Sequence, residues 1–422
     1  PGLACPVLPL QTVSSRRTFR QTVLQDLARP ASPDRARTAI VPSGNPKTVR
    51  QSDVDVRLPS FRSDGDRLNE AMPFAPESLA EFLDADFDTI IDVRSPSEFA
   101  EDHVPGAVNL PVLSDEERAR VGTIYVQDSP FRARKVGAAL VARNAARHIE
   151  GPLAGMEGGW CPLVYCWRGG QRSGSFASIL SQIGWRADVV EGGYRRWRRL
   201  VNGALYEAPF PAPVVLLDGN TGTAKTDLLR RLERRGIQVI DLEGLANHKG
   251  SALGEQGTQP EQKGFETALA AEIARLDESR PVVLEAESSK IGRINLPPTV
   301  FSAMKAAPRL EIDAPVPARV AFLVEDYGAA VGNDDAFSER LDLLRPHQGH
   351  ERVDEWQEML RTGDLTGLAT ELITNHYDPR YAKVRQRIGG RVLQTLHADR
   401  LDDVGRETLA DRIATLVNGL SR

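Results

Sequence analysis

The chain has 422 residues, a formal net charge of −5, and a composition of 41% hydrophobic and 26% charged residues. This length is sufficient for two or three domains, and the composition is that of an ordinary globular protein. No apolar run approaches the roughly 18 residues of a membrane span, so we expect no membrane association. The negative charge excludes binding of nucleic acid through overall charge, so any RNA contact must use local basic patches.

The cysteines are few, namely Cys5, Cys161 and Cys166. An odd and sparse set argues against a disulfide framework and favours a reducing compartment, so we expect a cytoplasmic protein. The first residues lack a charged stretch followed by a long apolar core, and we therefore expect no secretory signal.

Residues 1–70 are rich in Arg, Ser, Pro and Thr and show no sustained periodicity. The first 50 residues hold eight Lys or Arg against two Asp. This composition predicts a mostly disordered, basic N-terminal arm. A solvated tail and a segment that touches RNA are both compatible with it.

Apolar runs at 88–93 and 162–165 flank a helical pattern at 114–149, and further strand and helix patterns follow. Alternating strands and helices predict an α/β domain with a doubly wound sheet, which we place at 75–205. Sites in such sheets lie at the carboxyl ends of strands, where Cys166 falls.

A proline-bearing linker leads to a second buried strand at 214–218, a glycine-rich loop and a helix at 225–234. Further apolar strands follow, which predicts a second α/β domain of the P-loop NTPase-like type at 211–385. We predict a helical C-terminal tail at 386–422.

The first candidate site is the segment Val164–Ser173, where Cys166 follows an apolar run and precedes a glycine-rich turn. Glycines let backbone N–H groups turn toward the sulfur, and the following helix directs its positive N-terminus at it. With the charge of Arg172, these groups lower a thiol pKa and hold an anion against the sulfur. The predicted catalytic residues and their supporting glycines are Cys166, Arg172, Arg168, Gly169 and Gly170. Cys161 is placed either to resolve a persulfide or simply at a strand edge.

The second candidate site is Gly219–Thr226, which matches the phosphate-loop pattern G-x-x-x-x-G-K-[ST] except at Ala224. A strand precedes it and a helix follows it, as the motif requires. The extra methyl of Ala224 either tightens the loop or weakens nucleotide hydrolysis. The predicted phosphate-binding residues are Gly219, Thr221, Gly222, Lys225 and Thr226.

Polar segments at 241–251 and 285–293 follow the next strands of the second domain. Carboxylates at strand ends can order Mg²⁺ or a water molecule, and a solvated loop is the alternative for each segment. The metal, if there is one, is left open, with Mg²⁺ the ion considered. The predicted supporting residues are Asp241, Glu243, His248, Glu285, Glu287 and Arg293.

The best local basic patch for RNA lies at 194–199. On a helix Arg195 and Arg199 share one face, and Trp197 is placed to stack on a base or to pack inside. An interdomain helix with a solvated face is an equal alternative. The predicted tRNA-binding residues are Arg195, Arg196, Trp197, Arg198 and Arg199.

The first domain resembles the rhodanese family in the order and spacing of its motifs. The segments that carry the resemblance are Asp92–Phe99, His103–Pro111, the Cys166 loop and Glu191–Tyr194. In that family the cysteine carries sulfur or selenium. Common sulfurtransferase loops are one residue shorter between Cys and Arg, so the Cys-x5-Arg spacing implies a larger cradle, as in dual-specificity phosphatases.

Both domains together resemble the tRNA 2-selenouridine synthase family, a rhodanese domain fused to a P-loop domain, over about residues 76–385. Two positions depart from its pattern, Gln171 where a methionine is expected and Ala224 in the phosphate loop. The segments that match are Tyr165–Ser173, Asp241–Gly254, Glu285–Pro297 and His376–Tyr381.

The resemblance implies a transferase that converts wobble 2-thiouridine of tRNA to 2-selenouridine. A geranyl group from geranyl diphosphate first alkylates the sulfur, and selenium from selenophosphate then replaces the S-geranyl group. Lys225 would hold the diphosphate and Cys166 would act in selenium transfer. Both donors are co-substrates, and no tightly bound cofactor is expected. A selenophosphate-producing enzyme is the expected partner beside tRNA.

The residues alone leave other functions open. A nucleotide-dependent sulfurtransferase would hydrolyse ATP or GTP in a reaction that depends on Lys225. A Cys-dependent phosphatase would cleave an aryl phosphate and would be insensitive to Lys225→Ala. A non-enzymatic module that binds tRNA or phosphate would be unaffected by Cys166→Ser.

Overall fold

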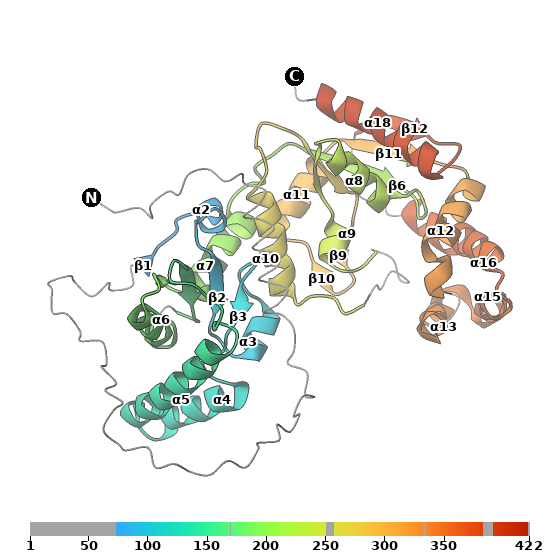
Figure 1. Cartoon of the computed structure of the whole chain (residues 1–422). Helices are drawn as coiled ribbons and strands as arrows, with labels where there is room; N and C mark the ends of the chain where they lie inside the picture. The colour runs from blue at the N-terminus through green and yellow to red at the C-terminus, as the bar shows by residue number, and fades with distance from the viewer. Residues whose placement is uncertain (1–72, 169, 250–256, 332–334, 383–390, 421–422) are drawn as a thin grey trace, which may run out of the picture. The chain divides into compact units, whose positions relative to one another are not determined.

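The computed structural model describes most of the chain, and Figure 1 shows the described residues in colour. The arm predicted at 1–70 lies outside them, as do Gly169 and part of the segment that follows His248. No helix among them is long and apolar enough to span a membrane. The described residues are 73–168, 170–249, 257–331, 335–382 and 391–420.

The described residues form two compact units. The second unit includes two short segments, Pro76–Ala85 and Ser97–Pro105, from the region predicted as the first domain. The remainder of that region, up to Gly193, belongs to the first unit, and the chain from Tyr194 onward belongs to the second.

The first unit is built on a five-stranded parallel sheet of order β1-β5-β4-β2-β3. All four residues of the central strand β4 are buried, as expected for a strand with both faces covered. The core includes Ile91, Val164 and Phe176. The elements are β1 (Pro73–Phe74), β2 (Thr89–Asp92), β3 (Val108–Asn109), α4 (Asp115–Gln127), α5 (Pro130–Glu150), β4 (Pro162–Tyr165), α6 (Gln171–Ile183) and β5 (Asp188–Val190).

The second unit has its own five-stranded parallel sheet, of order β12-β11-β6-β8-β7, and an antiparallel pair, β9 with β10. β6 is the middle strand, so the loop that follows it opens at the centre of the sheet edge. The strands are β6 (Val214–Gly219), β7 (Gln238–Ile240), β8 (Val282–Glu285), β9 (Lys290–Ile291), β10 (Ile294–Asn295), β11 (Arg309–Asp313) and β12 (Val392–His397).

The helices of the second unit surround this sheet and extend into a helical region with its own core around Leu341 and Trp356. They are α2 (Leu79–Leu83), α3 (Pro96–Glu101), α7 (Tyr194–Asn202), η1 (Gly203–Glu207), α8 (Lys225–Arg234), α9 (Leu242–Leu245), α10 (Gln262–Ile273), α11 (Pro298–Ala306), α12 (Val316–Val331), α13 (Asp335–Asp342), α14 (Arg345–Gln348), α15 (His350–Thr362), α16 (Leu365–Glu371), η2 (Leu372–Tyr377) and α18 (Asp403–Gly419).

The prediction of a helical C-terminal tail at 386–422 is correct for α18 but missed a strand, β12. β12 pairs in parallel with β11, with Leu310 opposite Gln394, and so completes the second sheet. The strand lies at the sheet edge and buries only Leu396, so its sequence lacks the apolar run that identifies the inner strands.

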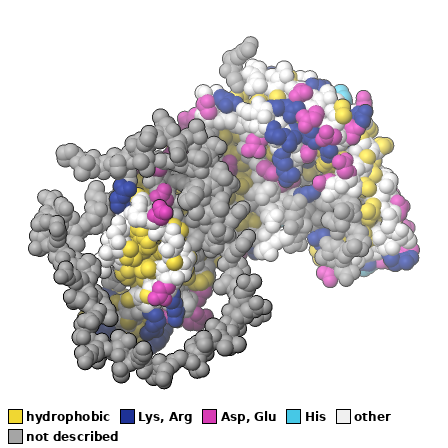
Figure 2. Space-filling view, viewed as in Figure 1, with side chains coloured by type: hydrophobic (Ala, Val, Ile, Leu, Met, Phe, Trp, Pro, Cys, Tyr) yellow, Lys and Arg dark blue, Asp and Glu magenta, His cyan; other side chains and the backbone are white. Residues whose placement is uncertain are grey.

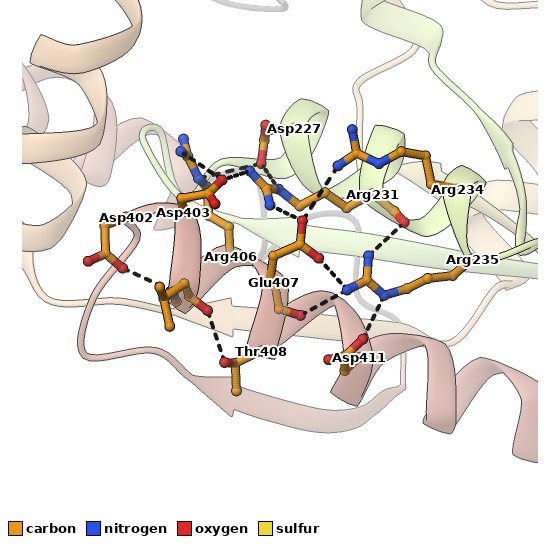
Figure 3. Close-up of polar contacts among 12 residues, drawn as sticks. Asp227, Arg231, Arg234, Arg235, Asp402, Asp403, Arg406, Glu407, Thr408 and Asp411 are labelled. Carbon is orange, nitrogen blue, oxygen red and sulfur yellow. Dashed lines mark hydrogen bonds and ion pairs between the residues drawn. The ribbon is translucent and has the colours of Figure 1, made fainter.

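The helix α18 is tied to α8, the helix that follows the glycine-rich loop, by a network of arginines and carboxylates (Figure 3). The guanidinium of Arg231, with a side chain only 6% exposed, forms ion pairs with Asp227, Asp403 and Glu407. Figure 2 shows dark blue and magenta side chains intermixed over these helices. The C-terminal segment is therefore an integral part of the second unit.

Candidate active-site loops

The Cys166 loop leaves the carboxyl end of β4 and enters α6, as the sequence predicts. Cys166 is 5% exposed, and its Sγ accepts a hydrogen bond from the Ser173 hydroxyl at 3.3 Å. The N–H of Gly170 in turn donates to the Ser173 Oγ at 3.3 Å. The serine therefore connects the thiol to the backbone of its own loop.

Hydrogen bonds and charge compete with burial at the Cys166 thiol. Burial is the largest single effect and raises the pKa of Cys166. The hydroxyl and N–H of Ser173 lower the pKa, as do the charge of Arg172 and the N–H of Arg168. The net result is a pKa below the ordinary thiol value, which favours the nucleophilic thiolate.

The two predicted catalytic arginines differ in exposure. Arg172 is half-buried in the first turn of α6, whereas Arg168 and Gly170 are exposed. Cys161 is buried, and its thiol donates to the Gly159 carbonyl at 3.5 Å. It precedes β4 whereas Cys166 follows it, and at about 3.3 Å per strand residue the two thiols lie at opposite ends of the strand. Cys161 is therefore not placed to resolve a persulfide.

A buried ion pair that the sequence analysis did not identify stands beside this loop. Asp92 lies opposite Tyr165 in the sheet register, and its carboxylate accepts from the Arg94 guanidinium at 2.6 to 3.1 Å. Arg94 is 1% exposed, and its guanidinium carbon lies 5.7 Å from the centre of the Tyr165 ring. The pair with Asp92 fixes the Arg94 guanidinium, and the contact of that guanidinium with the Tyr165 ring joins the carboxyl end of β2 to the strand that presents Cys166. Asp92 and Arg94 belong to the Asp92–Phe99 segment, which supports the family resemblance but for which the sequence predicted no role.

The second loop joins β6 to α8. The Lys225 ammonium donates to the Gly219 carbonyl at 2.9 Å, and the Thr223 hydroxyl donates to the Asn220 carbonyl at 2.8 Å. Gly222 has φ of +85°, and Ala224 has φ of +61°, in the left-handed region that strains an L-residue by about 1–2 kcal/mol. The loop therefore adopts the conformation that the motif requires, with alanine at a position that favours glycine.

Four acidic residues lie at the carboxyl ends of β7 and β8, namely Asp241, Glu243, Glu285 and Glu287. The Thr226 hydroxyl donates to Glu243 at 3.1 Å, and the N–H of Leu242 donates to Glu285 at 2.9 Å. Asp241 caps α9 by accepting from the Gly244 N–H at 2.6 Å. The predicted supporting carboxyls are thus gathered at one end of the sheet.

Burial and mutual repulsion raise the pKa of two of these acidic groups, Glu285 and Glu287. Burial first, and then Asp241 and Glu243, raise the pKa of Glu285 well above its ordinary value. Burial and then Glu243 raise the pKa of Glu287 to about 8, although Lys225 acts in the opposite direction. Glu287 therefore holds a proton at neutral pH, and the charged form of Glu285 is disfavoured in the same way.

Lys225 remains charged in this setting. Burial lowers the pKa of Lys225, but the nearby acidic groups of Tyr381, Glu243, Glu287 and Asp218 raise it above its ordinary value. A charged lysine next to the protonated Glu287 suits an incoming anion.

An arginine and an aspartate hold the loop from the helical region. The Arg319 side chain, 4% exposed, donates through Nε to the Thr221 carbonyl at 2.8 Å. It also forms a bidentate pair with Asp378, which accepts from Asn220 at 3.0 Å. Arg319 was missed because no motif surrounds it, whereas Asp378 lies in a segment already quoted for the family resemblance.

His248 and Arg293 are less clearly part of the site. His248 is half-buried, and its backbone N–H donates to the Glu243 carbonyl at 3.0 Å. Arg293 is exposed, and its guanidinium contacts the Gln259 carbonyl and the Glu261 carboxylate. Within the described part of the chain, no three His, Cys, Asp or Glu side chains are arranged to hold a metal ion.

Two family models match the chain. A rhodanese-like domain matches residues 75–200, and a tRNA 2-selenouridine synthase AAA domain matches residues 212–343. Proteins named tRNA 2-selenouridine synthase are similar over much longer stretches. That of Shewanella sp. (strain ANA-3) is 32% identical over 72% of this chain and 90% of its own length. That of Shewanella halifaxensis is 36% identical over 72% of this chain and 90% of its own.

The chain belongs to the tRNA 2-selenouridine synthase family. A third member, from Bdellovibrio bacteriovorus, is 38% identical over 61% of this chain and 70% of its own length. The chain is therefore an enzyme with a rhodanese-like domain followed by a P-loop-type AAA domain, as the sequence predicted. The Cys166 loop lies in the rhodanese-like domain, and the Gly219–Thr226 loop lies in the AAA domain.

The prediction that α7 presents a tRNA-binding face needs correction. Trp197 is fully buried, and its indole N–H donates to the Thr267 hydroxyl at 3.2 Å. Arg198 forms ion pairs with Glu266 and Asp102, and Arg196 donates to the Pro76 carbonyl at 3.0 Å. These side chains hold α7 in place and are not free to stack on a base or bind phosphate.

Arg195 and Arg199 remain exposed on α7. The sequence pattern could not separate the two faces, because a helix with a buried tryptophan and one with a stacking tryptophan have the same spacing.

Proposed function

We propose that this protein converts wobble 2-thiouridine of tRNA to 2-selenouridine through an S-geranylated intermediate, using geranyl diphosphate and selenophosphate. Family membership supports the overall conversion. The observation that supports the two-donor route is that one chain holds two strand-to-helix loops of different chemistry. One loop offers a thiol of lowered pKa, and the other offers a charged lysine beside Glu287, whose pKa is raised to about 8.

In the first step the uridine sulfur attacks C1 of geranyl diphosphate, the C–O bond breaks, and the N3 proton of the base is released. The leaving diphosphate would bind the Gly219–Thr226 loop, since Lys225 and the N-terminus of α8 neutralise its charge. Thr221 and Gly222 would contribute backbone N–H groups. The product thioether is a far better leaving group than the original thiocarbonyl sulfur.

In the second step the selenium of selenophosphate attacks C2 of the base, and the C2–S bond breaks to release geranyl thiol. Water then cleaves the Se–P bond, so that phosphate leaves and 2-selenouridine regains its N3 proton. We assign Cys166 and Arg172 to this step, because the Cys-x5-Arg loop can hold a tetrahedral oxyanion against the thiolate. An enzyme that produces selenophosphate would supply the donor, and the cytoplasm is the compartment proposed for the reaction.

The test is nucleoside mass spectrometry of 2-thiouridine tRNA incubated with the protein and both donors. We expect S-geranyl-2-thiouridine with geranyl diphosphate alone, and 2-selenouridine when selenophosphate is added. Lys225→Ala should block the first product, whereas Cys166→Ser should block only the second. Absence of any mass shift with wild-type protein under every donor combination would refute the proposal.

A Cys-dependent phosphatase is the second candidate, favoured by the lowered pKa of Cys166 beside Arg172. Such an enzyme would hydrolyse an aryl phosphate with Cys166→Ser inactive and Lys225→Ala fully active. Turnover of the aryl phosphate together with unmodified tRNA would favour this candidate over the synthase.

A further inference from the structure

The helical hairpin α4–α5 exposes apolar side chains that do not pack against the rest of the first unit. α4 runs for 13 residues without a single buried side chain. Around the turn that joins the two helices, Tyr125 is 56% exposed, Val126 is 82% exposed and Phe131 is 71% exposed. Large apolar side chains gathered at one exposed turn typically mark an interaction site.

Other residues hold the hairpin together. The buried face of α5, which includes Leu140, Val141 and Ala145, packs into the core of the first unit. Asn144 donates to the Val112 carbonyl at 3.0 Å and to Glu117 at 2.8 Å, and Glu117 also completes the capping box of α4. The exposed aromatics can therefore change without loss of these contacts.

The middle of the hairpin, around the turn, is basic in a chain whose net charge is −5, whereas its two ends carry the acids Asp115, Glu116, Glu117 and Glu150. From Arg118 to Arg147 it carries seven Lys or Arg and a single acid, Asp128, which pairs with Arg132. Figure 2 shows dark blue side chains, with some magenta beside them, where α4 and α5 lie in Figure 1. The basic residues of this stretch, all exposed, are Arg118, Arg120, Arg132, Arg134, Lys135, Arg143 and Arg147.

The charge decides which occupant fits. The N-terminal segment of this chain is itself basic, with eight Lys or Arg against two Asp in residues 1–50, so it is repelled. A second copy of the hairpin would be repelled in the same way. Arginines interleaved with exposed aromatic rings match a polyanion that also offers flat bases, which is RNA.

We infer that the α4–α5 hairpin is an RNA-binding surface that docks the tRNA substrate. The inference rests on the proposed function. Arg120, Arg134 and Lys135 contact phosphates, while Tyr125 and Phe131 stack on unpaired bases. The hairpin thus takes the role that the sequence first suggested for α7.

The experiment measures tRNA binding to the full chain by fluorescence anisotropy across a range of salt concentrations. One variant combines Arg120→Gln, Arg134→Gln and Lys135→Gln, and another combines Tyr125→Ser with Phe131→Ser. The matched control removes three exposed arginines of the second unit, through Arg230→Gln, Arg275→Gln and Arg361→Gln. Thermal melting verifies that every variant is folded.

We expect the basic hairpin variant to bind tRNA about tenfold more weakly, with a salt dependence reduced by about three phosphate contacts. The aromatic variant should also bind about tenfold more weakly but keep the wild-type salt dependence. Wild-type-like binding by both hairpin variants would overturn the inference while leaving the proposed function intact. If wild-type protein itself binds no tRNA, the proposed function fails, and the inference fails with it.

Discussion

The two loops share an architecture but differ in how they handle charge. Each leaves the carboxyl end of a parallel strand and enters the N-terminus of a helix. The Cys166 loop surrounds a thiol with hydrogen-bond donors, so it stabilises a negative charge that belongs to the protein. The Lys225 loop instead holds a positive charge beside two carboxyls, Glu285 and Glu287, whose pKa values are raised by burial and by neighbouring acidic groups. The charge of the Cys166 loop therefore suits a nucleophilic thiolate, and that of the Lys225 loop suits the binding of an anion.

The largest expected effect comes from the backbone of the second loop. In Gly222→Ala the new Cβ would lie 3.0 Å from the Arg319 carbonyl oxygen and 3.1 Å from the Leu323 side chain, at φ of +85°. We expect a loss of roughly 2–3 kcal/mol of loop stability and of diphosphate binding. Calorimetric titration with inorganic diphosphate measures this loss.

Two variants control for this result. Gly236→Ala has a similar φ of +75° but open space around the new Cβ, so it should cost only about 1 kcal/mol and leave binding unchanged. Ala224→Gly should stabilise the loop slightly, since it removes the strain at φ of +61°. Normal diphosphate binding by Gly222→Ala would show that this backbone does not form the anion site.

The second prediction concerns the protons of the carboxyl cluster. The pKa of Glu287 is about 8 in the folded protein, against 4.5 for an ordinary glutamate. Between these values the folded state holds a proton that the unfolded state has lost, so stability falls as pH rises through this window. In Glu287→Gln this dependence should disappear, so between about pH 6 and pH 8 the variant should gain about 2 kcal/mol of stability relative to wild type.

The measurement is the thermal unfolding midpoint between about pH 6 and pH 8.5. Glu358→Gln is the matched control, because that glutamate is exposed and its pKa is lowered by Arg361. It should leave the wild-type slope unchanged in this range. If the unfolding midpoint changes with pH in the same way for wild type and Glu287→Gln, the raised pKa of Glu287 is refuted.

Much of this contrast could be predicted from the sequence, because the local patterns are strong. The strand before each loop is an apolar run, and each loop has a specific spacing of glycines and charged residues, so Cys166 and Lys225 were identified directly. What the sequence could not supply was long-range pairing. Arg319 reaches the loop from α12, 98 residues after Thr221, and no local pattern reports such a contact. Trp197 was ambiguous for a related reason, since its burial depends on α10, which lies far along the chain.

The smallest expected effect tests the Cys166 loop. Ser173→Ala removes a hydroxyl that donates to the thiol at 3.3 Å, without opening a large cavity. One lost hydrogen bond to a charged group should raise the pKa of Cys166 and slow alkylation by iodoacetamide at neutral pH about threefold to tenfold. Ser175→Ala changes an exposed serine on the same helix and should react like wild type. The pH profile of the alkylation rate separates the explanations, because a weaker thiolate moves its midpoint upward, whereas altered access changes only its height. An unmoved midpoint would mean that Arg172 and the backbone N–H groups lower the pKa of Cys166 without the Ser173 hydroxyl. The Cys166 loop would then stabilise its negative charge through backbone N–H groups and a cationic side chain, as the Lys225 loop would for a bound anion.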